Sequence, residues 1–97
     1  GERMKKKIAL IEDDTDLFAL LKYNLEKEGF AFVGAHTGKG AIELFLRERP
    51  DLVLLDLNMP GLHGLEILRM LKRMEPAPKV AILTVSDARE NIVAAMR

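Results

Sequence analysis

The 97 residues suffice for one small domain, and because 48% of them are hydrophobic they can form a real core. Basic and acidic residues number 15 each, so the net charge is zero and gives no support to a surface for nucleic acid or acidic lipid. No apolar run approaches the roughly 18 residues that a membrane helix needs, and the lack of cysteine excludes disulfides and thiolate metal sites and fits a reducing cytoplasm.

Strand and helix patterns alternate along the chain. In order, we expect a strand at Lys7–Ile11, a helix at Thr15–Glu28, a strand at Phe30–His36, a helix at Lys39–Arg49, a strand at Leu52–Leu55, a helix at Gly64–Met74, a strand at Lys79–Leu83 and a helix starting near Asp87. Apolar residues at close to helical spacing support the first three helices: Leu17, Leu20, Leu21, Leu25, Ala41, Ile42, Leu44, Phe45, Ile67, Leu68 and Leu71.

Residues with special backbone preferences mark the ends of the first two helices. Asp14 or Thr15 can cap the first helix, and Gly29 suits the left-handed position after its end. Thr37 can cap the second helix, which Pro50 stops. No linker or repeat divides the chain, so the pattern predicts a single α/β domain with a parallel sheet.

The third predicted strand carries an acidic residue at its end. Leu52–Leu55 is typical of a strand that is buried on both faces, and Asp56 follows at once. Pro60, Gly61 and Gly64 then require a loop. Because ligands of open parallel sheets bind beyond the carboxyl ends of the strands, Asp56 is placed for chemistry rather than packing.

Right-handed crossovers bring all these strand ends to one edge of the sheet. The residues that we expect there are Glu12, Asp13, Asp14, Asp56 and Thr84. Carboxylates about 4 Å apart repel by about 4 kcal/mol at an effective dielectric constant near 20, so one must take a proton or the group must bind a cation. For Asp14 alone we prefer the role of a solvated residue or helix cap.

An all-oxygen ligand set favours Mg²⁺ or Ca²⁺, and a shallow edge that retains waters favours Mg²⁺. Magnesium in turn suits an anionic substrate, above all a phosphoryl group. The acidic edge therefore predicts magnesium and phosphoryl chemistry.

Over nearly its whole length the chain resembles the receiver domain of two-component response regulators. The matching positions are Glu12 and Asp13, the run Asp56-Leu57-Asn58-Met59-Pro60, Gly64, Glu66 and Thr84. The run LLKYNLEKEGF is most similar to receivers that are attached to winged-helix DNA-binding domains. The resemblance implies a cytoplasmic signalling protein with a flavodoxin-like, doubly wound sheet of strand order 2-1-3-4.

The same resemblance implies that Asp56 accepts a phosphoryl group from a sensor histidine kinase and relays the signal to a DNA-binding output domain. Asp13 and Asp56 would bind Mg²⁺ directly, Glu12 through water, and Asn58 through its backbone carbonyl. The Thr84 hydroxyl would donate to the phosphoryl oxygens. The protein would then be a phosphoacceptor that assists its own phosphotransfer and dephosphorylation, rather than an enzyme.

Two departures from the family pattern affect these expectations. Receivers usually carry a small residue where this chain has Val85, and its branched side chain would narrow access at the phosphoryl-binding position. The fifth strand with its lysine, the switch aromatic and the fifth helix would follow Arg97, so we expect an incomplete receiver over residues 1–97. Gly1–Arg3, before Met4, is typical of a cloning remnant. Without the fifth strand and helix, the edge of the fourth strand and the sheet face near the first and third strands would be exposed. This exposure predicts self-association, element swapping or instability.

Of three rival functions, the first two fit less well, and the third is the runner-up for a fragment that lacks the active-site lysine. A phosphatase of the haloacid dehalogenase type needs a second carboxylate where Asn58 stands. Gly38-Lys39-Gly40 lacks the other residues of a phosphate-binding loop. The third alternative is a phosphorylation-independent docking or dimerisation module. His36 and His63 have no partner at metal-ligand spacing, so we interpret them as ordinary strand-end and loop residues.

Overall fold

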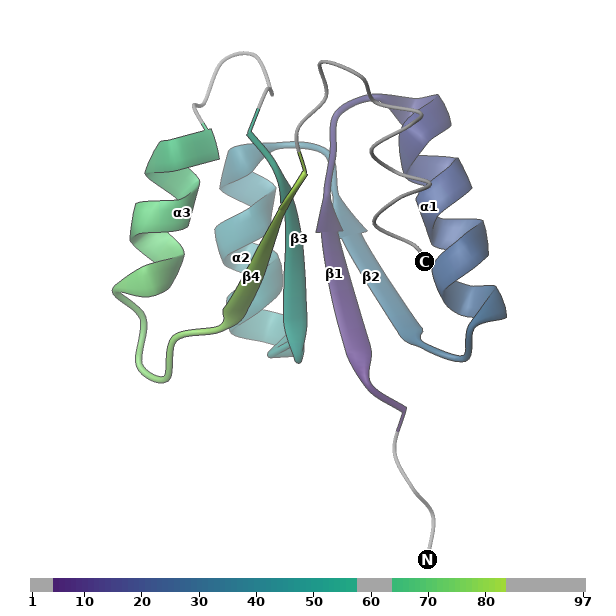
Figure 1. Ribbon diagram of the computed structural model, residues 1–97. Coiled ribbons are helices and arrows are strands. Elements are labelled where there is room, and N and C mark those ends of the chain that lie inside the picture. Colours follow the sequence, from purple (N-terminus) through teal and green to yellow (C-terminus); the bar gives the residue numbers. More distant parts are fainter. Residues whose placement is uncertain (1–4, 58–63, 84–97) are drawn as a thin grey trace, which may run out of the picture.

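The computed structural model describes residues 5–57 and 64–83 (Figure 1). Strands and helices alternate through them as β1 (Lys7–Ile11), α1 (Thr15–Lys27), β2 (Ala31–Ala35), α2 (Gly38–Glu48), β3 (Leu52–Asp56), α3 (Gly64–Lys72) and β4 (Lys79–Leu83). Each predicted element in this part of the chain is present, with ends shifted by at most two residues. The helix predicted from Asp87 lies outside the described residues.

All four strands are parallel, and their order is β2-β1-β3-β4. This confirms the predicted flavodoxin-like order. The central pair aligns Ile11 with Leu55, while β4 aligns Leu83 with Asp56. The crossovers therefore bring the carboxyl ends of all four strands to one edge (Figure 1).

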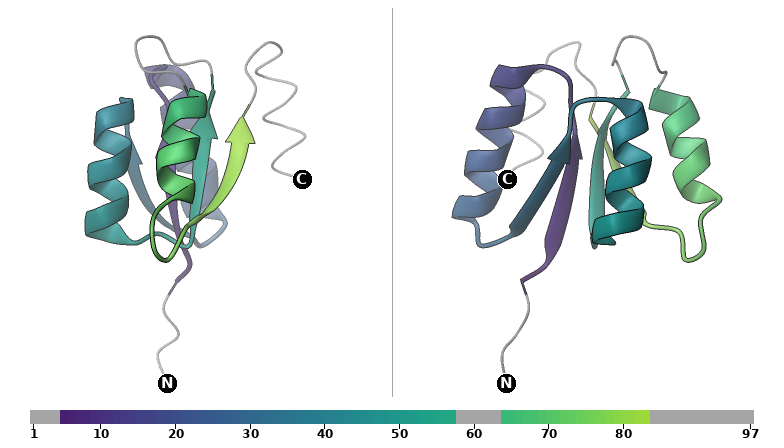
Figure 2. Two further views of the ribbon diagram at one scale, coloured as in Figure 1. Left: turned by 90° about the vertical axis from the view of Figure 1, so that its left-hand side faces the viewer. Right: turned by 180° about the vertical axis from the view of Figure 1, so that it is seen from behind.

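Helices cover both faces of the sheet (Figure 2). The larger core lies between the sheet and α2 and α3; it is formed by Ala9, Ile11, Ala41, Leu44, Phe45, Val53, Leu55, Ile67 and Leu71. A smaller core on the α1 side centres on Leu10, Leu21 and Leu83. Among the described residues, no helix combines the length and apolar character needed to cross a membrane.

The expected burial of β3 on both faces is complete on only one of them. Val53 and Leu55 are fully buried against the α2–α3 side, whereas Leu52 and Leu54 are only partly buried. Successive side chains of a strand point to opposite faces, so this difference shows that the α1 side of β3 is the less covered one. On α1 itself, Leu20 is exposed although it follows the helical apolar spacing.

The helix ends follow the predicted caps. The Asp14 side chain accepts a hydrogen bond from Leu17 N at 3.0 Å, and Thr37 Oγ1 accepts one from Gly40 N at 3.0 Å. Gly29 has a φ of +96°, the left-handed conformation expected after α1. At the end of α2 it is Arg49 that adopts φ 45°, and its guanidinium lies 5.0 Å from the centre of the Phe45 ring.

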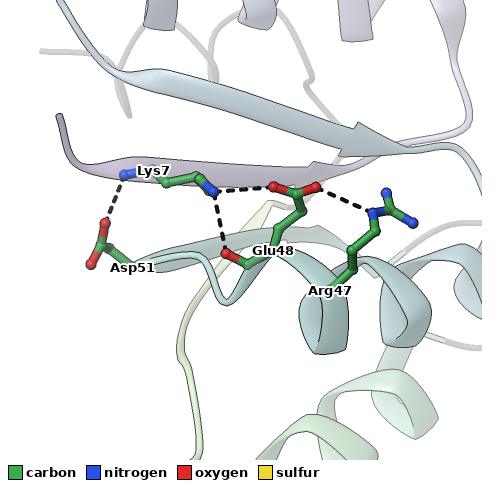
Figure 3. Close-up of polar contacts among 4 residues, drawn as sticks. All are labelled: Lys7, Arg47, Glu48 and Asp51. Atoms are coloured by element: carbon green, nitrogen blue, oxygen red, sulfur yellow. Dashed lines mark hydrogen bonds and ion pairs between the residues drawn. The ribbon is translucent and has the colours of Figure 1, made fainter. Parts of the chain in front are cut away.

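Polar contacts join β1 to α2 and β3 at the amino ends of the strands (Figure 3). The backbone nitrogen of Lys7 donates to Asp51 Oδ2 at 2.7 Å, and its Nζ donates to Glu48 Oε1 at 3.1 Å. Arg47 Nε donates to Glu48 Oε2 at 3.2 Å. These cations, Lys7 first, lower the pKa of Glu48. Lys7 thus joins β1 to α2 through an ion pair and to Asp51 through a hydrogen bond, opposite the acidic edge.

Candidate functional site

Three carboxylates meet where β1 and β3 leave the sheet. Glu12 and Asp13 follow β1, Asp56 ends β3, and the two strands are neighbours in the sheet. One carboxylate oxygen from each of the three residues lies within 4.8 Å of the other two. The structure thus brings Asp13 and Asp56 together as expected. Asp14 instead caps α1, in keeping with the role we preferred for it.

The other predicted site residues lie outside the described part of the chain. These are Asn58, Thr84 and Val85. Their predicted positions beyond β3 and β4 place them in sequence next to the described strand ends. Their contributions to the site stay predictions.

Two of the three carboxyl groups are almost fully buried. Glu12 is 1% exposed and Asp56 is 2% exposed, whereas Asp13 is exposed to solvent. Burial raises the pKa of Glu12 from 4.5 to about 8; the Asp14 backbone N–H opposes this rise and the charge of Asp56 adds to it. At neutral pH, Glu12 therefore holds a proton unless a cation replaces it.

The hydrogen bonds of Glu12 leave one oxygen unsatisfied. Its Oε2 accepts a hydrogen bond from Asp14 N at 2.9 Å. Its Oε1 is buried and has no hydrogen-bond donor among the described residues. The adjacent carboxylates of Asp13 and Asp56 can donate only when protonated. A buried acceptor without a hydrogen bond lowers the free energy of unfolding. We therefore expect a proton, a water or a metal ion at this oxygen.

This arrangement fits a magnesium ion. Mg²⁺ takes oxygen ligands at about 2.1 Å, so two ligands on opposite sides of it are about 4.2 Å apart. Three carboxylate oxygens within 4.8 Å of one another are close to this separation, so they could surround one ion after a small side-chain movement or with one residue acting through water. The exposed position of Asp13 leaves the edge open to water, which Mg²⁺ usually retains.

Two contacts that hold the site were missed in the sequence. The Nδ1 atom of His36, at the end of β2, lies 3.0 Å from the carbonyl oxygen of Glu12. Gly64, at the start of α3, packs against the end of β3: a Cβ there would overlap Leu57 Cα and lie 3.1 Å from the Asp56 carbonyl oxygen. In the sequence, only the parallel pairing of the first two strands could have suggested the His36 contact.

Comparisons with known proteins find a matching family model and similar solved structures. Residues 8–97 match the sequence model of the family described as "Response regulator receiver domain". A receiver domain protein from Clostridium thermocellum is 31% identical over 93% of this chain and 74% of its own, with a TM-score of 0.77.

Two further solved structures are similar. The BeF3-activated N-terminal receiver domain of Klebsiella pneumoniae RstA is 33% identical, over 94% of this chain and 79% of its own, with a TM-score of 0.76. A sensor protein from Polaromonas sp. JS666 is 29% identical, over 93% and 73%, with a TM-score of 0.80. The family match over residues 8–97 includes Glu12, Asp13 and Asp56.

Proposed function

Because the chain belongs to the response regulator receiver domain family, we propose that Asp56 accepts a phosphoryl group from the phosphohistidine of a sensor histidine kinase. The observation that supports this most directly is the clustering of Glu12, Asp13 and Asp56 within 4.8 Å at the carboxyl edge of the sheet. Asp56 is the one of the three that lies within a central strand, where its backbone pairs with Leu83 of β4.

In the transfer step, an Asp56 carboxylate oxygen attacks the phosphorus atom in line with the bond to the histidine nitrogen. A P–O bond forms as the P–N bond breaks, and the departing imidazole keeps the electron pair and takes up a proton. Little covalent chemistry is left for the protein, which acts by positioning and by compensating charge.

Asp13 and Asp56 would hold Mg²⁺ directly, and Glu12 through water. The backbone carbonyl of Asn58 would complete the protein ligands. When bound, the metal supplies positive charge beside the phosphoryl oxygens. The Thr84 hydroxyl would donate to a phosphoryl oxygen, with Val85 next to it.

The phosphorylated domain would relay its state to an output domain. Phosphorylation adds charge and acceptor oxygens at the sheet edge, and a hydroxyl from the end of β4 can respond by moving towards them. A winged-helix DNA-binding domain is the output that we propose, with transcription as the regulated process. The receiver itself, over residues 1–97, would not contact nucleic acid.

The test is phosphorylation with Mg²⁺ and a small acyl phosphate as the phosphoryl donor, followed by intact mass spectrometry. We expect one added phosphoryl group in the parent protein and none in Asp56→Asn. Asp16→Asn, which changes an exposed acidic residue in the first turn of α1, is the matched control and should react like the parent protein.

Beryllofluoride mimics an aspartyl phosphate and gives a second readout by NMR. Mg²⁺-dependent shifts at Asp56 and its neighbours would support the proposal. A folded protein that neither gains a phosphoryl group nor responds to beryllofluoride would instead favour the phosphorylation-independent docking module.

A further inference from the structure

The turn that carries Asp13 is held on both sides by hydrogen bonds. Before it, Glu12 N donates to the carbonyl oxygen of Ala35 at 3.1 Å, which extends the pairing of β1 and β2 by one residue. After it, Asp14 N donates to Glu12 Oε2 and the Asp14 side chain caps α1. Asp13 itself is exposed, so its direction depends on the backbone that supports it.

The backbone carbonyl group of Glu12 also has a hydrogen-bond partner among the described residues. The partner is His36, which lies between the end of β2 at Ala35 and Thr37, the N-cap of α2. His36 Nδ1 lies 3.0 Å from the oxygen. A carbonyl oxygen only accepts hydrogen bonds, so Nδ1 carries the proton and donates it.

The ring of His36 has a fixed neighbour in α1. Its centre lies 4.2 Å from that of the Phe18 ring, with the two planes inclined by 42°. Phe18 also makes an edge-to-face contact with Phe32, at 5.4 Å and 85°. It lies so close over Gly34 that a Cβ at that position would overlap its ring. The direct contact with the Phe18 ring restricts the plane of the imidazole ring and hence the direction of its Nδ1–H.

We propose that His36 is a positioning residue of the acidic site. Its Nδ1–H, held by packing against Phe18, donates to the Glu12 carbonyl oxygen and fixes the peptide plane that leads into Asp13. Since that peptide is planar, holding its oxygen also holds the nitrogen and Cα of Asp13. The inference rests on the proposed function, because the geometry being held is that of a metal ligand. His36 touches neither the metal nor the phosphoryl group in this role.

The decisive comparison separates the hydrogen bond from the ring packing. His36→Phe keeps an aromatic ring against Phe18 and removes the donor, whereas His36→Asn places an amide N–H at the same distance from Cβ as Nδ1. We expect His36→Phe to raise the dissociation constant for Mg²⁺ about fivefold, the equivalent of one hydrogen bond. We expect His36→Asn to stay within about twofold of the parent protein, because the donor is retained. The measurement is an NMR titration with Mg²⁺ alone, which follows the amides of Asp13 and Asp56.

A variant of the same aromatic cluster serves as the control for stability. Phe32→Leu removes the edge-to-face partner of Phe18 without touching the Glu12 carbonyl. It should lower the melting temperature and leave Mg²⁺ affinity unchanged.

Three outcomes would contradict the inference. Equal Mg²⁺ affinity in His36→Phe and the parent protein would overturn the role of His36 alone. A loss in His36→Asn as large as that in His36→Phe would show that a retained donor does not preserve the Mg²⁺ affinity, contrary to the inference. If the folded parent protein binds no Mg²⁺ at Asp13 and Asp56, the proposed function fails, and this inference fails with it.

Discussion

Glu12 makes the stability of the folded protein depend on pH. Its pKa of about 8 in the folded protein compares with 4.5 ordinarily, so between these values the folded state holds a proton that the unfolded state has lost. Below pH 4.5 both states are protonated and there is no penalty; as pH rises towards 8, the free energy of unfolding falls, by an amount on the order of a few kcal/mol. Metal-free protein should therefore be more stable at pH 5 than at pH 8.

The measurement is chemical denaturation in the presence of a chelator between pH 5 and pH 8. Glu12→Gln removes the titrating group and keeps the shape of the side chain, so this variant should lose most of the slope. Glu48 does not interfere, because its pKa is lowered. Its contribution to the free energy of unfolding is complete above pH 4.5 and is lost only as the pH falls through its folded-state pKa. A slope that is unchanged in Glu12→Gln would assign the pH dependence to another group.

At the scale of elements, the junction of β3 and α3 leaves no room for a side chain at Gly64. A Cβ there would meet the backbone of Leu57, which cannot rotate away as a side chain could. We expect Gly64→Ala to destabilise the protein by about 1–3 kcal/mol, the usual cost of overpacking. Urea denaturation measures this. The next residue, Leu65, is exposed, so Leu65→Ala is the matched control and should change stability by less than about 0.5 kcal/mol.

Gly64→Ala also tests whether the position of α3 affects Asp56. Since a Cβ at Gly64 would lie 3.1 Å from the carbonyl oxygen of Asp56, Gly64→Ala should shift the Asp56 amide in NMR spectra, whereas Leu65→Ala should not. Unchanged stability and an unchanged Asp56 resonance in Gly64→Ala would mean that α3 can begin further from β3 without cost.

The elements also show what the sequence could predict. Alternating strand and helix patterns, with a fixed crossover hand, were enough to bring Asp13 and Asp56 together, because every parallel strand ends at the same edge. The contact of His36 with Glu12 depends on the residue at which β2 ends, and strand ends are the least certain part of a sequence pattern. Arg49 is a second example. Its left-handed backbone conformation is not expected of an arginine, although the following proline disfavours the helical conformation there.

At the scale of the whole molecule, the two edges of the sheet have opposite chemistry. Lys7 and Arg47 neutralise Glu48 at the amino-terminal edge, whereas Glu12, Asp13 and Asp56 gather at the carboxyl edge, and no ion pair joins Glu12 or Asp13 to a cation within the described residues. A chain with zero net charge thus concentrates negative charge where a cation and a phosphoryl group would meet. The fold separates the edge that holds elements together from the edge at which we propose binding.

The molecule's surface also predicts self-association of the 97-residue chain. Within the described residues β4 pairs only with β3, its Ile82 is 38% exposed, and Leu54 of β3 is only partly buried. An apolar strand edge is a surface on which another copy can add. We expect the average mass in sedimentation velocity to rise with protein concentration. Ile82→Lys places a charge on this strand and should reduce the rise, whereas Leu46→Lys, at an exposed position of α2, should not. A single monomer peak at every concentration, with cooperative melting, would refute association through this edge.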